Sequence, residues 1–128
     1  MRSGLLAIWI WLIGSMAVIM QFIVQLSSGA MVDGLIYSFH LSGASAGMLA
    51  GAYYPVYCLL QVPAGVVVSR IGAQKFLIIG MLAASWATMC FAYADHFYFA
   101  MFGRFISGVG LSCCFVSLIY IINHWFKP

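Results

Sequence analysis

Residues 5–28 read LLAIWIWLIGSMAVIMQFIVQLSS, an apolar run without a single formal charge. An α-helix rises about 1.5 Å per residue, so a run of this length covers the ~30 Å hydrocarbon core of a bilayer. A cleavable signal peptide has a shorter apolar core of about 7 to 15 residues and an A-x-A-like site after it, which this run lacks. We therefore expect a membrane-spanning helix that stays in the protein.

Three further apolar runs follow, at about residues 46–69, 76–94 and 97–122. Membrane-spanning β-strands need about ten residues of strict alternation, which none of these runs shows. The sequence therefore predicts an all-α membrane protein with four transmembrane helices in one unit, residues 1–128. The segment MVDGLIYSF, residues 31–39, is expected to extend the first helix by about two turns beyond the bilayer.

The composition also indicates a membrane protein. Hydrophobic residues make up 66% of the 128 residues and charged residues only 5%, with a mean hydropathy of +1.11. A soluble domain of this length needs a polar surface, which so few charges cannot supply. We therefore expect the lipid bilayer to surround the chain. The net charge of +3 is scattered, with no two basic residues adjacent, so a nucleic-acid surface is excluded as well.

The basic residues predict the orientation. Four of the five fall on one side of the predicted membrane, namely Arg2, Arg70, Lys75 and Lys127. Both acidic residues, Asp33 and Asp95, fall on the other side. Since cytoplasmic loops carry an excess of Lys and Arg, both termini are expected in the cytoplasm. The expected location is integral and multi-pass, in a plasma membrane or a bacterial inner membrane.

Catalytic or metal-binding patterns are missing from the sequence. The four cysteines lie inside apolar runs without ligand spacing, at positions Cys58, Cys90, Cys113 and Cys114. The three histidines stand at the edges of the runs, and no Gly-x-Ser-x-Gly elbow or phosphate-cradling loop occurs. We expect no enzyme activity, no metal and no cofactor.

The connection between the second and third spans reads GVVVSRIGAQK, residues 65–75. This short basic turn resembles the signature loop of the major facilitator superfamily. The matching positions are Gly65, Arg70, Gly72 and Lys75. Ser69 stands where that family has an acidic residue, and Gln74 stands where it has a basic one.

The fourth span contains RFISGVG, residues 104–110, which is similar to the Arg-x-x-x-Gly-x-Gly motif of the same family's fourth helix. Burying a charged Arg in a membrane costs about 2.5–3.5 kcal/mol, so Arg104 should face protein or a wet cavity. The alternative is that its side chain reaches the outer headgroups. Gly108 and Gly110 lie near Arg104 and would let a neighbouring backbone approach closely.

Polar residues at helical spacing outline a candidate solute pathway. They are Gln21 and Gln25 in the first span and Tyr53, Tyr57 and Gln61 in the second. The alternatives are an interfacial belt for the tyrosines and a helix-to-helix hydrogen bond for the glutamines. On another face of the second span, glycines recur every four residues and predict close helix contact; they are Gly43, Gly47 and Gly51.

The resemblance implies a transporter with about twelve helices in two six-helix halves that hold a solute between them. The present residues look like the first part of the N-terminal half, with helices one, two and four facing the cavity and helix three peripheral. We expect transport of a small solute by a secondary active transporter of which this chain is a fragment. Its partners would be the remaining transporter helices, and alone it should not transport. The alternative is a stand-alone four-helix membrane protein, either an oligomeric exporter subunit or a non-transporting assembly partner.

Overall fold

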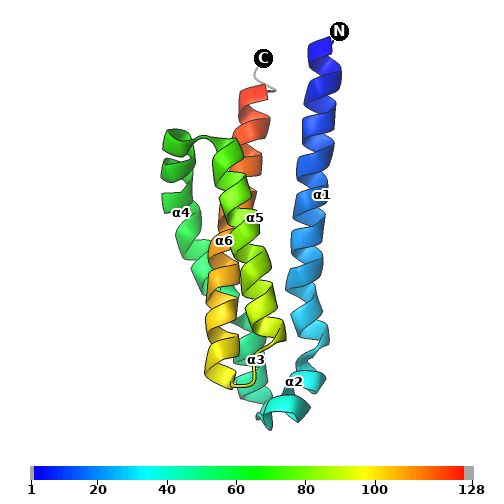
Figure 1. Ribbon diagram of the computed structural model, residues 1–128, viewed down its shortest axis with the longest axis vertical. Helices are drawn as coiled ribbons and strands as arrows, with labels where there is room; N and C mark the ends of the chain where they lie inside the picture. The colour runs from blue at the N-terminus through cyan, green and yellow to red at the C-terminus, as the bar shows by residue number, and fades with distance from the viewer. Residues whose placement is uncertain (1, 126–128) are drawn as a thin grey trace.

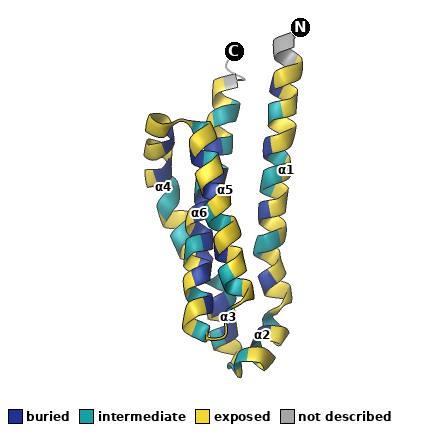
Figure 2. Ribbon diagram, viewed as in Figure 1, coloured by how far each residue is buried: buried dark blue, intermediate teal, exposed yellow. Residues whose placement is uncertain are grey.

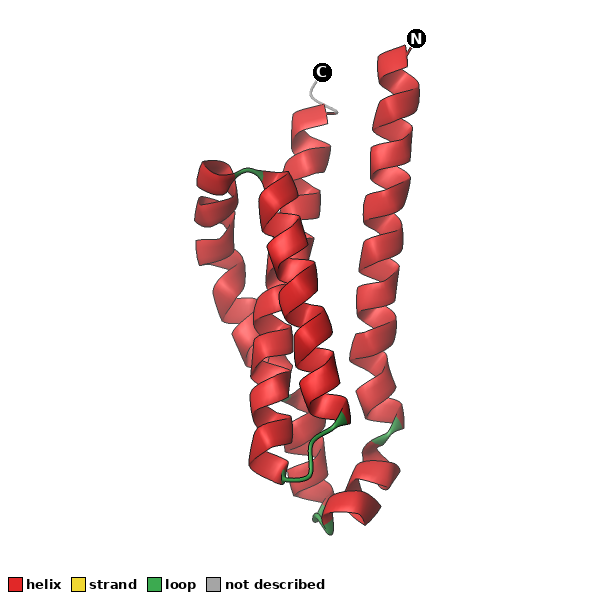
Figure 3. Ribbon diagram, in the orientation of Figure 1, coloured by secondary structure: helices red, strands yellow, loops and turns green. Residues whose placement is uncertain are grey.

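The computed structural model describes residues 2–125, with side chains from residue 5 to residue 124, and its regular elements are all α-helices (Figure 3). In chain order the helices are α1 (Arg2–Ala30), α2 (Val32–Phe39), α3 (Gly43–Gly51), α4 (Tyr53–Ile71), α5 (Ala73–Ala92) and α6 (Phe97–Trp125) (Figure 1). Four stretches are long and apolar enough to span a membrane, namely Leu5–Ala30, Gly43–Ile71, Ala73–Ala92 and Phe97–His124. The prediction of an all-α membrane protein with four transmembrane helices is confirmed.

The segment after the first span is helical but does not extend α1. The helix ends at Ala30, and Met31, with φ −95° and ψ 7°, separates it from α2. His40 then ends α2 in the left-handed conformation, with φ 50°. The expected extension of the first helix is therefore replaced by a separate helix that turns away from α1 (Figure 1).

The second span is built from two helices, α3 and α4, which meet at Ala52. Ser42 caps α3, because its hydroxyl accepts a hydrogen bond from the Ser45 backbone N–H at 3.3 Å. Pro55 has no N–H to donate to the Gly51 carbonyl four residues earlier, which accounts for the break at this point. Pro63 lies inside α4 without ending it.

A single residue, Gly72, connects α4 to α5. Its φ of 93° and ψ of 140° lie in a region that other residues rarely adopt. The connection from α5 to α6 is also short, so α5 runs antiparallel to both α4 and α6 (Figure 1). The start of α1, the Gly72 turn and the end of α6 all lie at one end of the bundle, which we call the Gly72 end.

The centre of the bundle is α6. It packs most extensively against α5, next against α4, and more lightly against α1. In the most apolar window of α6, 44% of the residues are buried, against 17% in that of α1 (Figure 2). The helices therefore offer lipid a broad apolar surface, which includes Trp9, Leu59 and Leu82.

Two small residues allow α5 and α6 to touch. A Cβ on Gly110 would lie 2.6 Å from the Ala84 backbone nitrogen, and one on Gly80 would lie 2.8 Å from the Gly110 carbonyl oxygen. The glycines of the second span behave differently. A Cβ on Gly43, Gly47 or Gly51 would meet nothing within 4 Å in the described part of the chain, so the close contact expected there is not made.

Of the four basic residues that predict the orientation, the structure describes the side chains of two. Arg70 lies in the last turn of α4 and Lys75 in the first turn of α5, both exposed at the Gly72 end. The side chain of Arg2 and the whole of Lys127 lie outside the described residues.

Candidate functional site

Arg104 lies two turns inside α6 and faces protein. Its side chain is only 5% exposed, and its Cζ atom lies 4.2 Å from the ring centroid of Phe91 in α5. This geometry is a cation–π contact, which contributes more as the site is desolvated. The Nε atom is buried and has no hydrogen-bond partner among the residues that the structure describes. Arg104 therefore brings a positive charge and an unused donor into the bundle.

Tyr53, at the start of α4, is the polar neighbour of Arg104 across the helix interface. Its side chain is 1% exposed, and its backbone carbonyl lies against Gly108, one turn after Arg104 on α6. Its hydroxyl has no hydrogen-bond partner, and its ring packs beside that of Tyr57 at 6.4 Å between centroids. The first residue of the predicted tyrosine stripe thus faces the bundle interior and not an interfacial belt.

Gln21, in α1, is the third residue whose buried polar atoms lack a partner in the described part of the chain. It is 5% exposed, and neither Nε2 nor Oε1 makes a hydrogen bond. It lies near Tyr57, which also has Gln61 beside it. Both Tyr57 and Gln61 are half-buried, and the Tyr57 ring lies 6.3 Å from that of Phe115 in α6. Three of the predicted pathway residues, from α1 and α4, are therefore brought together.

Gln25 is also half-buried, one turn from Gln21, but it lines none of the cavities described below. Its backbone carbonyl accepts a hydrogen bond from the Ser28 hydroxyl at 2.8 Å.

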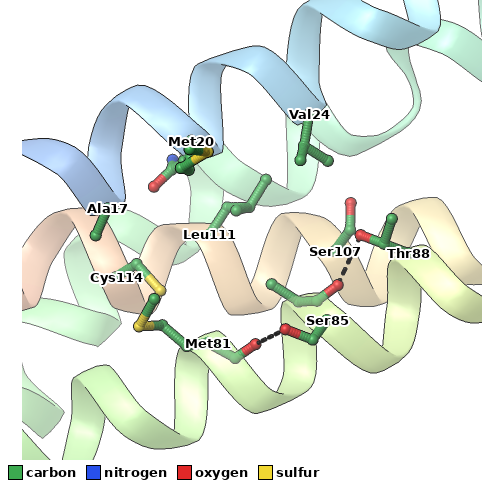
Figure 4. Close-up of a pocket in the computed structure, with 11 residues that line it drawn as sticks. Ala17, Met20, Val24, Met81, Ser85, Thr88, Ser107, Leu111 and Cys114 are labelled. Carbon is green, nitrogen blue, oxygen red and sulfur yellow. Dashed lines mark hydrogen bonds between the residues drawn. The ribbon is translucent and has the colours of Figure 1, made fainter.

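Two adjoining cavities lie between α1, α5 and α6. The central cavity, of about 130 Å³, contains Gln21 (Figure 4). The outer cavity, of about 280 Å³, contains Arg104. Three residues line both, namely Val24, Thr88 and Ser107. Gln21 and Arg104 therefore line two adjoining cavities with a shared wall, and we call the two cavities together the hollow.

Hydroxyl groups give the cavities an acceptor-rich lining. The Ser85, Thr88 and Ser107 hydroxyls donate to carbonyls of their own helices, over 2.8, 2.8 and 3.1 Å. Since each hydroxyl proton is used in this way, the oxygens remain acceptors for a solute. The dashed lines of Figure 4 mark two of these bonds, from Ser85 to the Met81 carbonyl and from Thr88 to the Ala84 carbonyl. A polar solute can thus find donors at Arg104 and Gln21 and acceptors at these hydroxyls.

The lining of the cavities includes residues that the sequence reasoning missed. The family resemblance implied a peripheral third helix, yet α5 contributes Ser85 and Thr88 to the central cavity. The sequence contains a pattern that could have indicated this face. Ser85 and Thr88 are three residues apart in an otherwise apolar stretch, so they lie on the same side of the helix. Ser107 lies one turn after Arg104 and could have been found by the same spacing.

The glycines of the fourth-span motif lie where neighbouring backbones approach. A Cβ on Gly108 would lie 2.8 Å from the Tyr53 carbonyl oxygen, while Gly110 faces α5. Gly108 thus lets α4 come close to α6 beside Arg104, and Gly110 does the same for α5.

The signature-loop residues do not take part in this hollow. Gly65 has nothing within 4 Å of a Cβ, and Gly72 forms the α4–α5 turn at the Gly72 end. The Ser69 hydroxyl bonds back to the Val66 carbonyl at 2.7 Å. Arg70 and Lys75 are exposed beside the turn.

No three His, Cys, Asp or Glu side chains gather as metal ligands within the part of the chain that the structure describes.

Comparison with known proteins gives a family match. The model of the Major Facilitator Superfamily matches residues 10–128. A potential vesicular glutamate transporter of Caenorhabditis elegans is 25% identical over 95 residues, 70% of this chain and 18% of that protein. An uncharacterized transporter of Bacillus subtilis is 28% identical over 91 residues, 71% of this chain and 21% of that protein. The chain therefore spans about one fifth of the length of these relatives. No solved structure matches.

Proposed function

The chain belongs to the major facilitator superfamily, a family of solute transporters, and we propose that it forms part of a secondary active transporter for a small solute that carries a negative charge. The solute would bind in the hollow between α1, α5 and α6, with Arg104 as the anchor of its anionic group.

The buried charge of Arg104 carries this proposal. A charged side chain inside a membrane costs about 2.5–3.5 kcal/mol, so it is retained where a partner or a function offsets that cost. The two acidic residues of the chain, Asp33 and Asp95, are both exposed in connections outside the spans. A carboxylate or phosphate on the solute would supply the missing counter-charge, and Arg binds both groups with two parallel hydrogen bonds.

The name of one relative agrees with this class of solute. The Caenorhabditis elegans protein is named as a potential glutamate transporter, and glutamate carries carboxylates. We infer only the anionic group from this agreement, since the two chains are 25% identical.

The remaining polar residues are assigned to the path of the solute. Gln21, Tyr57 and Gln61 lie near one another and would offer hydrogen bonds to the solute, and Gln25 would add another one turn further along α1. We assign the signature-loop residues Gly65, Arg70, Gly72 and Lys75, together with both termini, to the cytoplasmic side, because basic residues are in excess there. The membrane is a plasma membrane or a bacterial inner membrane.

Further helices are needed to enclose the solute, because a cavity requires walls on all sides. We propose that they are provided by the rest of a longer transporter or by a separate chain. The competing possibility, a four-helix protein acting alone as an exporter subunit or as an assembly partner, is decided by the size of the native product in membranes. A stable product of four spans at normal abundance would favour that possibility.

Transport by Arg104 variants tests the site in the protein as its gene encodes it. Arg104→Gln should lower uptake of an anionic solute at least about tenfold at unchanged membrane level, since a charge-assisted hydrogen bond contributes about 1.5–3 kcal/mol. Arg104→Lys should retain part of the uptake, and Phe105→Leu, at an exposed neighbour, should retain all of it. If Arg104→Gln lowers uptake and membrane level equally, Arg104 serves folding and the proposal is wrong.

A further inference from the structure

A second pair of cavities forms a groove along α1 towards the Gly72 end. One cavity, of about 490 Å³, lies between α1, α5 and α6, and the next, of about 480 Å³, opens at the Gly72 turn. They share Ile10, Gln74 and Ile121. We call the two together the inner groove, and the part at the turn its mouth.

The mouth of the inner groove is polar and cationic. Lys75 and His124 line it, together with Gln74 and Tyr120. The rings of Tyr120 and His124 are stacked, 6.5 Å apart and inclined by only 6°, so His124 is held at the rim. One positive charge and several hydrogen-bond donors thus face the same opening, from α5 and from α6.

The interior of the inner groove is apolar. Beyond Gln74 its lining consists almost entirely of aliphatic and sulfur-containing side chains, among them Ile13, Leu77, Met81 and Leu118. Small polar ions gain nothing from such a surface, whereas a hydrocarbon chain is favoured there by about 0.8 kcal/mol per buried CH₂. The groove therefore matches a molecule with an anionic head and an apolar tail.

The charges of the chain favour the same ligand. Asp33 and Asp95 lie in connections at the opposite end of the bundle, so within the described residues no acidic side chain opposes an anion at the mouth (Figure 1). A bilayer presents phosphate headgroups at the depth where its helices end. Basic pockets between transmembrane helices at the cytoplasmic surface are suited to such headgroups.

We propose that the inner groove binds one anionic phospholipid of the cytoplasmic leaflet. Its headgroup phosphate accepts hydrogen bonds from Lys75 and His124, and one acyl chain lies against Ile13 and Leu118 between α1 and α6. The apolar end of the inner groove adjoins the central cavity, with which it shares Ala17, Met20, Met81 and Cys114, whereas Arg104 and Gln21 line neither part of the groove.

Lipid binding to the purified protein tests the headgroup contact. The full product of the gene is titrated in detergent with phosphatidylglycerol or phosphatidylcholine, and bound lipids are counted by native mass spectrometry. Replacing both Lys75→Gln and His124→Gln should weaken phosphatidylglycerol binding about fivefold or more, since each basic residue near a membrane surface contributes about that factor. Arg70→Gln, at an exposed cation outside the groove, is the matched control and should leave binding unchanged. Equal binding by the double variant and the control would overturn the proposal.

The acyl chain is tested by filling the groove. Ile13→Trp places a bulky ring on its wall, while Ile19→Trp changes an equally accessible α1 residue that does not line it. Only Ile13→Trp should lower phosphatidylglycerol binding, with Lys75 and His124 intact. Millimolar inorganic phosphate should not displace the lipid. If phosphate does displace it, or if both tryptophan variants bind normally, the mouth is at most a site for free anions and the lipid proposal is wrong.

Discussion

The backbone carbonyl of Tyr53 lies against Gly108, where α4 meets α6: a Cβ at position 108 would come within 2.8 Å of that oxygen. The same Cβ would lie 3.2 Å from the Cβ of Val56. Since Gly108 lies one turn after Arg104 on α6, this glycine sets how closely α4 approaches α6 beside the buried cation. A contact that involves main-chain atoms cannot be relieved by a change of rotamer.

Gly108→Ala should therefore destabilise the protein by about 1–3 kcal/mol, the usual cost of an added methyl group in a packed interior. Thermal unfolding of the purified protein in detergent measures the loss. Gly34→Ala is the control, because a Cβ there meets nothing within 4 Å and alanine is the better helix former. Equal stability of the two variants would mean that α4 and α6 can separate at no cost.

The four spans were predictable because only a few backbone structures are stable in the hydrocarbon core of a bilayer. A long apolar run must satisfy its backbone hydrogen bonds internally, so length and polarity together imply a helix. For Arg104 the cost of a charge in lipid favoured a side chain that faces protein over one that reaches the headgroups, and the side chain is 5% exposed. Gly108 and Gly110 were expected near close helix contacts, and the structure has them there.

Features that depend on single hydrogen bonds or on helix placement were not predictable. The breaks at Met31 and Ala52 leave hydropathy unchanged, and only Pro55 gives a local sign of one of them. The hollow between α1 and α5 joins residues far apart in sequence, so Ser85 and Thr88 could be noticed as polar but not assigned to a site. Hydrophobic patterns identify the buried faces of helices but not their neighbours.

The Gly72 turn provides a prediction on backbone strain. Gly72→Ala puts a Cβ on a residue with φ 93° and ψ 140°, which should cost about 1–3 kcal/mol and lower the temperature of unfolding. Gly65→Ala changes another glycine of the same signature loop, but one with helical geometry and open space, and should be tolerated. If Gly72→Ala is as stable as Gly65→Ala, the turn can adopt another backbone conformation.

The proposed orientation predicts which residues a membrane-impermeant thiol reagent reaches. In a variant without native cysteines, Lys75→Cys should react only after the cells are opened, because excess basic residues stay in the cytoplasm. Asp33→Cys, in α2 at the opposite end of the bundle, should react in intact cells. Reaction of Lys75→Cys in intact cells would invert the assignment of both termini.

Gln21 is expected to affect the stability and the uptake activity of the protein in opposite directions. Its buried amide makes no hydrogen bond in the described part of the chain. A buried polar group left unsatisfied costs about 1–3 kcal/mol, so Gln21→Leu, similar in size, should raise the temperature of unfolding. If the amide is kept for a solute, the same variant should lower uptake, the trade-off typical of binding sites. Gln25→Leu, at a half-buried residue outside the cavities, should change both quantities less. A lower unfolding temperature for Gln21→Leu would show instead that the amide is bonded in the assembled transporter.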